Sequence, residues 1–437
     1  MRPTQAKDHP ADAPPPVPRL VHLSGSPARV PPDGGTARDG TAVLPPGVDD
    51  ARAVDADVPA AVGRVLDDVL SDRLARARAV DSLFAADLAG RVARFTRAGG
   101  RRTRAQLVWW SLRACGGDGT AALRIGAALE LLQTCALVHD DVMDGAELRR
   151  GRPALHTDVH AQYAGSARPA RIGRFAEAAG VLAGDLALAW ADDLVAETPL
   201  PPRTALVVRR LWSDMRTEMV AGQYLDVQGQ LTAAHSLPRA LRAACLKSAL
   251  YSVERPLALG AVLAGADDAN LRALCSAGRR VGLAFQLRDD LNDVFGDPRQ
   301  TGKPHGGDIR EGKPTCLVAL ARARAEAAAD HRALAVLERS LGDADLTPDG
   351  LDEVREVLVA TGARAAVEAR IGRLVTQGLR HLDSARLDPE AGGRLRRLLG
   401  TAADAAPPDG PRSRPHPAPH PAQAMSLTAA GAPETAR

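Results

Sequence analysis

Aromatic residues are scarce in this chain, since Phe, Trp and Tyr together make up 3 % of its 437 positions. Packing must therefore rest mainly on Leu, Val and Ala. An excess of one charge is also lacking, because 56 basic residues face 53 acidic ones and leave a formal net charge of +3 at pH 7. The basic residues are not interleaved with aromatics, so the composition does not support nucleic-acid binding.

Cysteines and long apolar segments are likewise few. The cysteines lie in apolar, helix-like contexts without a CxxC spacing, which is typical of buried free thiols in a reducing compartment; they are Cys115, Cys135, Cys245, Cys275 and Cys316. Every long apolar run is interrupted by charge before about 18 residues, and no apolar signal segment follows the N-terminal MRPTQAK. We expect no integral membrane segment and a cytoplasmic protein.

Strand-like alternation is almost absent, whereas Ala, Leu and Val recur at helical spacing between short Gly, Pro or Asp breaks. The predicted fold class is all-α. Residues 1–60 and 402–437 are rich in proline with little apolar periodicity, which predicts disordered tails around one domain at 61–401. The expected helices are 63–96, 103–115, 120–144, 175–196, 204–230, 238–264, 270–295 and 314–329, with several more to about 400.

One acidic motif, DDxxD, occurs twice, each time directly after an apolar run. Its aspartates are Asp140, Asp141 and Asp144 in HDDVMDG, and Asp289, Asp290 and Asp293 in RDDLNDV. On a helix, positions i and i+4 lie on one face, so carboxylates one turn apart converge. Mg²⁺ prefers carboxylate oxygens, with water and phosphate completing its shell. Two such motifs facing each other are predicted to hold a diphosphate through divalent cations.

Basic clusters supply cations for phosphate oxygens that the metals leave uncovered. Three of these residues follow a Gly-Gly break at an expected helix start, where anions are favoured. Others follow the first acidic motif by about one turn, lie in LKSAL, or lie in TGKPHGGDIREGKPT after the second motif. In chain order the cluster residues are Arg101, Arg102, Arg104, Arg149, Arg150, Lys247, Lys303 and Lys313.

With these motifs in this order, the chain resembles the trans-prenyltransferases, the isoprenyl (polyprenyl) diphosphate synthase family, over nearly the whole core. GGRRTR resembles the family's GGKRxRP, and DDVMD with ELRRGRP resembles its first aspartate-rich motif. GDLAL, GQYLD and KSAL resemble its GD helix, GQxxD and KTAxL. FQLRDDLND with TGKPHGGDIREGKPT resembles its second motif and the loop that follows.

The resemblance implies an isoprenoid-synthase-type helical bundle around a central cavity, usually a homodimer, and Mg²⁺, with three ions in the family. Asp140, Asp144 and Asp289 would ligate the metals, and the other three aspartates would do so directly or through water. The departing diphosphate would meet Arg149, Lys247 and Lys303, with Gln223 and Gln286 around the metal-phosphate shell. Isopentenyl diphosphate would lie on Arg101, Arg104, Gln133 and Arg150, with Phe285 packed nearby. Arg102, Ser248 and Lys313 complete the expected substrate-binding residues.

Product length should depend on residues just before the first motif. Cys135 and Ala136 lie five and four positions before Asp140, about 5.4 Å deeper on a helix, where many farnesyl-forming relatives place an aromatic floor. These small residues predict room for a further isoprene unit, with Leu132 as the next stop, and hence a C20 product, geranylgeranyl diphosphate. A floor from another helix, and a C15 product or one of C25 or more, remain as alternatives.

Two other classes of function share parts of this pattern. A class I terpene cyclase has the first aspartate motif, but it normally carries an NSE-type second motif and needs no isopentenyl diphosphate site. A non-catalytic partner subunit of another synthase usually shows eroded aspartates, and all six are intact here. The sequence therefore favours a catalytic prenyltransferase that takes isopentenyl diphosphate and an allylic diphosphate.

Overall fold

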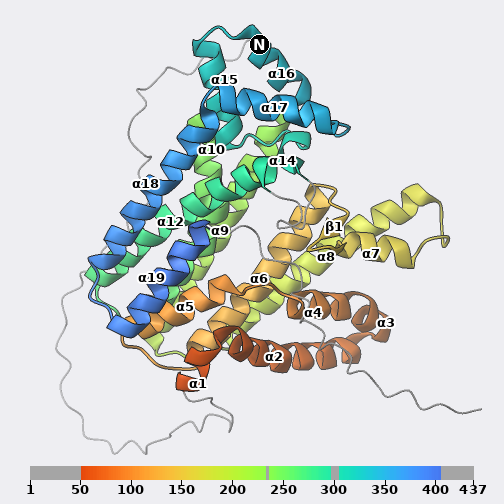
Figure 1. Ribbon diagram of the computed structural model, residues 1–437. Coiled ribbons are helices and arrows are strands. Elements are labelled where there is room, and N and C mark those ends of the chain that lie inside the picture. Colours follow the sequence, from red (N-terminus) through yellow and green to blue (C-terminus); the bar gives the residue numbers. More distant parts are fainter. Residues whose placement is uncertain (1–50, 233–235, 297–304, 405–437) are drawn as a thin grey trace, which may run out of the picture. The chain divides into compact units, whose positions relative to one another are not determined.

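The structure is a computed structural model that describes residues 51–232, 236–296 and 305–404 (Figure 1). Its described residues are helical apart from short connections and one two-stranded hairpin, so the all-α prediction is confirmed. The buried side chains are overwhelmingly Leu, Val and Ala, joined by four largely buried tryptophans, Trp109, Trp110, Trp190 and Trp212. An aromatic-poor composition thus yields an aliphatic core.

The N-terminal helices differ from the single helix predicted over 63–96. They are α1 (Ala51–Ala56), α2 (Val58–Val80), α3 (Ser82–Phe84), the π-helical η1 (Ala85–Ala89) and α4 (Gly90–Arg97). Asp81 interrupts the helix with extended backbone, and its carboxylate accepts a hydrogen bond from the Phe84 amide. Residues 51–60 and 402–404, assigned to the tails from the sequence, are mostly helical; the rest of both predicted tails lies outside the described residues.

The middle of the chain supplies the helices that carry the motifs. These are α5 (Thr103–Ala114), α6 (Ala121–Met143), α8 (Pro169–Ala196), α9 (Pro202–Thr232), α10 (Leu237–Ala244), α11 (Arg255–Leu263) and α12 (Asp268–Phe295). Helix α6 packs along α8, while both α9 and α12 pack against η2 (Cys245–Glu254). The predicted helix 238–264 is continuous, but η2 in its middle is a π-helix, a rare geometry that often occurs at functional sites.

Helix α6 is the most apolar of the long helices. Among the described residues it alone is long and apolar enough to cross a membrane by length and composition. However, 72 % of that apolar window is buried inside the protein. Burial of this kind is what a core helix of a globular protein requires.

A small hairpin that the sequence analysis did not predict follows α6. Strands β1 (Leu148–Arg149) and β2 (Arg152–Pro153) pair antiparallel, with Arg149 opposite Arg152. The two turn residues, Arg150 and Gly151, both have positive φ, of 54° and 71°. This is the backbone of a tight hairpin turn whose twist matches that of the strands. The turn aims Arg149 back at the end of α6, and α7 (Leu155–Gln162) follows.

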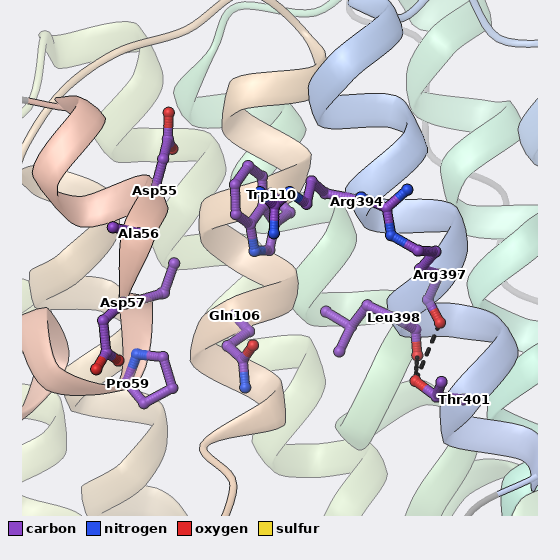
Figure 2. Close-up of a pocket in the computed structure, with 11 residues that line it drawn as sticks. Asp55, Ala56, Asp57, Pro59, Gln106, Trp110, Arg394, Arg397, Leu398 and Thr401 are labelled. Atoms are coloured by element: carbon purple, nitrogen blue, oxygen red, sulfur yellow. Dashed lines mark hydrogen bonds between the residues drawn. The ribbon is translucent and has the colours of Figure 1, made fainter.

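The C-terminal third is helical as expected. Its elements are α14 (Gly307–Arg310), α15 (Cys316–Ala327), α16 (His331–Ser340), α17 (Pro348–Ala360), α18 (Ala363–Asp383) and α19 (Pro389–Asp404). Helix α18 packs along α12, and α19 packs on α5 and α12. A surface groove lies where α19 meets α5 and the start of α2, with Arg394 over the Trp110 ring (Figure 2). Neither aspartate motif lines this groove.

Candidate active site

The first aspartate motif lies at the C-terminal end of helix α6, and its carboxylates pair with several polar side chains. Asp140 accepts hydrogen bonds from Lys247 Nζ at 3.2 Å and from Gln223 Nε2 at 3.1 Å. Asp141 is fully buried and accepts one from Arg149 Nε at 2.6 Å. The guanidinium of Arg149 also lies 3.4 Å from Asp140. The motif is therefore surrounded by the cations that the sequence assigned to it.

Lys247 reaches this motif because α9 and η2 approach unusually closely. A Cβ atom on Gly222 of α9 would lie 2.3 Å from the backbone nitrogen of Lys247, so only glycine fits. The close approach brings the next residues of GQYLD against η2, and Lys247 Nζ donates to Asp226 Oδ2 at 2.8 Å. Asp226 is a site residue that the sequence analysis quoted within its motif but gave no role.

The second motif, on α12, is joined to η2 and to the segment after it. Asp290 is buried and accepts a hydrogen bond from Gln286 Nε2 at 2.8 Å, while the Ser248 hydroxyl donates to Gln286 Oε1. Asp293 Oδ2 accepts from the Asp308 amide at 3.0 Å. Asp289 is exposed. Lys303, predicted to lie here, is outside the described residues.

Lys313 connects the two motifs. Its ammonium lies 3.0 Å from Asp144 of the first motif and 3.7 Å from Asp308, whose amide binds the second motif. It also pairs with Glu311. The sequence analysis missed Asp308 and Glu311. Their sequence positions could have indicated them, because Asp308 lies five residues and Glu311 two residues before Lys313, a lysine already assigned to the site.

The carboxylates are in unequal electrostatic environments. Burial raises the pKa of Asp290 well above its ordinary value, and the neighbouring carboxylates of Asp308 and Asp289 raise it further. At Asp140, burial also acts to raise the pKa, but Lys247 and the other nearby cations outweigh it and the pKa is lowered. Negative charge is thus neutralised at the first motif and crowded at the second.

The donor set fits divalent cations bound together with a diphosphate. The described residues hold no ready-made cluster of three or more metal-ligating side chains, and the carboxylates of the first motif are paired with Lys247, Arg149 and Lys313. However, Asp141 Oδ2 is buried without a hydrogen-bond partner, and the pKa of Asp290 is raised by burial and then by the like charges of Asp308 and Asp289, which a divalent cation would relieve. The many carboxylate oxygens are ligands that Mg²⁺ prefers.

The residues assigned to isopentenyl diphosphate gather around Glu130 of α6. Glu130 is 7 % exposed, and burial raises its pKa although the guanidinium groups of Arg104, Arg102 and Arg150 oppose that shift. Arg102 turns toward α2 and donates to the Pro59 carbonyl at 2.6 Å. Arg150 donates to the Ala98 carbonyl at 3.3 Å.

Three further residues predicted for substrate binding are Gln133, Arg101 and Phe285. Gln133 accepts a hydrogen bond from Tyr251 of η2 at 2.9 Å. Arg101 is exposed at the start of α5, and Phe285 is half-buried on α12 beside Gln286. Gln133 and Arg104 therefore both contact η2, whereas Arg102 contacts α2.

A model of the polyprenyl synthetase family matches residues 87–350. The chain belongs to this family. It is 35 % identical over 275 residues to the farnesyl diphosphate synthase of Geobacillus stearothermophilus, a match that covers 60 % of this chain and 84 % of that one. It is 36 % identical over 244 residues to a geranylgeranyl diphosphate synthase of Mycobacterium tuberculosis H37Rv, covering 55 % of this chain and 65 % of the relative.

The fold of this polyprenyl synthetase is similar to that of a solved structure. It is the crystal structure of geranylgeranyl pyrophosphate synthase from Corynebacterium glutamicum complexed with isoprenyl diphosphate and magnesium. The TM-score is 0.73 at 35 % sequence identity, over 78 % of this chain and 98 % of that one. The isoprenoid-synthase-type fold predicted from the motifs is thereby confirmed.

In this polyprenyl synthetase the residues predicted to set product length lie on α6 as expected. Leu132 and Cys135 are buried, and Ala136 is half-buried. Cys135 lies 3.7 Å from His139 Nδ1, and burial raises the pKa of its thiol to about 12, as do Asp185 and Asp192 of α8. Cys135 therefore faces α8, and Ala136 is the more exposed residue of the pair.

Proposed function

We propose that this polyprenyl synthetase joins isopentenyl diphosphate head-to-tail to an allylic diphosphate in a Mg²⁺-dependent reaction, and that its main product is C20 geranylgeranyl diphosphate. The observation that carries the proposal is that Lys313 pairs with Asp144 of the first motif and with Asp308, whose amide binds Asp293 of the second, while Lys247 and Arg149 lie beside the first motif. Such an acidic set with a basic surround suits a metal-bound diphosphate leaving group.

Each residue set has a distinct role in the proposed reaction. Asp140, Asp144 and Asp289 would hold the metal ions, with the remaining three aspartates as direct or water-mediated ligands. Bound Mg²⁺ supplies the positive charge that stabilises diphosphate as it departs. Arg149, Lys247, Lys303 and Lys313 add hydrogen-bond donors to the same oxygens, whose negative charge grows as the allylic C–O bond breaks.

Bond formation needs no nucleophile from the protein. The π electrons of isopentenyl diphosphate attack the allylic carbocation, a C–C bond forms, and the released diphosphate removes the proton that restores the double bond. Arg101, Arg104, Gln133 and Arg150 would hold isopentenyl diphosphate in line for this attack. The aliphatic helices around the site keep water from the cation, so positioning and exclusion of water are the main contributions of the chain.

The C20 product rests on the absence of an aromatic side chain at Cys135 and Ala136. With small residues there, the growing chain would pass one helical turn, about 5.4 Å, deeper before it meets Leu132. A C15 product is the second candidate, since the Geobacillus relative is named a farnesyl diphosphate synthase.

A cytoplasmic homodimer belongs to the same proposal. Helix α8 packs on α6 with one face and exposes Phe175, Val181 and Leu182 on the other, with 47 %, 45 % and 57 % of their surface accessible. A row of exposed apolar side chains on a long helix suits burial against a second copy. Light scattering of the purified protein at several concentrations tests this part directly.

The activity is tested by incubating purified protein and Mg²⁺ with labelled isopentenyl diphosphate plus dimethylallyl, geranyl or farnesyl diphosphate. The products are dephosphorylated and separated by chromatography. A linear C20 alcohol is expected, and another linear length would keep the reaction but refute the chain-length argument. No elongation with any primer by folded protein would refute the reaction and favour a cyclase or a non-catalytic partner subunit.

A further inference from the structure

The π-helix η2 touches both sides of the candidate active site. At its start, Lys247 binds Asp140 and Asp226, and Ser248 binds Gln286, which in turn binds Asp290. These are contacts to the allylic, metal-binding side. One turn later, η2 presents a second pair of side chains, Tyr251 and Ser252, to the residues assigned to isopentenyl diphosphate.

Tyr251 fixes the orientation of Gln133. Its side chain is 3 % exposed, and its hydroxyl donates to Gln133 Oε1 at 2.9 Å. A tyrosine hydroxyl is protonated at neutral pH and can donate, and burial raises the pKa of Tyr251 further. With the carbonyl of the amide held in this way, the NH₂ group of Gln133 faces away from Tyr251 and can donate to a phosphate oxygen.

Tyr251 and Ser252 also hold Arg104. The guanidinium carbon of Arg104 lies 4.5 Å from the centroid of the Tyr251 ring, within the range of a cation–π contact. The same guanidinium donates to Ser252 Oγ at 2.7 Å. The planar guanidinium is thus fixed from two directions. Two phosphate-binding candidates from different helices, α5 and α6, therefore share Tyr251 as a common support.

We propose that Tyr251 is a positioning residue for isopentenyl diphosphate, which sets the orientation of Gln133 and Arg104 while Lys247 and Ser248 of the same π-helix serve the allylic side. This inference rests on the proposed function, because it assigns the diphosphate of isopentenyl diphosphate to Gln133 and Arg104. A purely structural Tyr251 would instead support only core packing, and its loss would affect both substrates alike.

Tyr251→Phe tests the inference, since it removes the hydroxyl and keeps the ring beneath Arg104. We expect the Kd of isopentenyl diphosphate, measured by calorimetry without any allylic substrate, to rise about threefold to tenfold, the range for one lost hydrogen bond. In turnover the KM for isopentenyl diphosphate should rise by a similar factor. The KM for the allylic primer and kcat should stay within about twofold of wild type.

Two variants serve as controls. Tyr163→Phe removes a tyrosine hydroxyl that donates to Asp87, away from the aspartate motifs, and should leave both KM values unchanged. Ser248→Ala removes the contact to Gln286 and should produce the opposite split, with a larger change for the allylic primer. Thermal unfolding of each variant separates a change in binding from a loss of folded protein.

Unchanged affinity for isopentenyl diphosphate in folded Tyr251→Phe, or equal losses for both substrates, would overturn the inference. Absence of isopentenyl diphosphate binding by the wild-type chain would overturn it as well. A wild-type chain without turnover, whose binding of isopentenyl diphosphate still weakens in Tyr251→Phe, would refute the proposed function and support the positioning role. The calorimetric and kinetic readouts thus separate the two failures.

Discussion

Lys313 should be the most important single cation for the metal-free stability of the site. Its side chain is 16 % exposed and that of Asp144 is 8 % exposed, and the two lie 3.0 Å apart. Coulomb's law with an effective dielectric constant of about 20 gives roughly 5 kcal/mol for a pair at this distance before desolvation is counted. Removing one partner of a buried pair typically costs about 3 to 5 kcal/mol, because the other charge stays buried.

Lys313→Met removes the charge and keeps much of the side-chain volume, so Asp144, Asp308 and Glu311 would lose their shared ammonium. We expect unfolding in denaturant with EDTA to show a loss of about 3 to 5 kcal/mol. Mg²⁺ without diphosphate should stabilise the variant more than wild type, because the cation relieves the same repulsion and needs no diphosphate donor from Lys313. Lys313→Arg should retain most of the stability.

Arg310→Met provides a matched control in the same segment, because Arg310 contacts backbone carbonyls of His305 and Leu346 and, within the part of the chain that the structure describes, pairs with no carboxylate. It should show no extra response to Mg²⁺. Equal stability of Lys313→Met and wild type in EDTA would refute the assignment of Lys313 as the link between the motifs. An equal gain of Lys313→Met and wild type from Mg²⁺ alone would refute the electrostatic explanation.

Three further predictions concern α6 and the cysteines. Ala136→Phe should shorten the main product from C20 to C15, and an unchanged product distribution with turnover retained would contradict the chain-length proposal. Burial raises the pKa of Glu130 above its ordinary value of 4.5. Its contribution to the free energy of unfolding therefore falls as the pH rises from about 4.5 through the pKa of the folded state. The Tm should fall less over this pH range in Glu130→Gln than in wild type, and identical profiles of Tm against pH would disprove this. Burial raises the pKa of Cys115 to about 11 and of Cys135, Cys275 and Cys316 to about 12. Iodoacetamide at pH 8 should modify these thiols about 100-fold more slowly in folded than in unfolded protein, which mass spectrometry can measure, and fast labelling of folded protein would contradict the burial.

Local sequence features were sufficient for most of the helices. The predicted segments 103–115, 120–144 and 270–295 differ by at most two residues at either end from α5, α6 and α12, because apolar spacing and Gly or Asp breaks act within one helix. The error at 63–96 arose from Asp81, whose side chain caps a new helix in the middle of a continuous apolar pattern. The hairpin was missed because each of its strands has only two residues.

The sequence by itself determined the all-α fold, the family and the two aspartate motifs, since each depends on residues close together in the chain. The tertiary structure alone decided which charges meet. Lys313 joins Asp144 to Asp308, and Tyr251 joins Gln133 to Arg104. These pairings depend on how closely two helices pack, as at Gly222, and on the path of the π-helix η2. The spacing of residues within a motif does not specify either of these features.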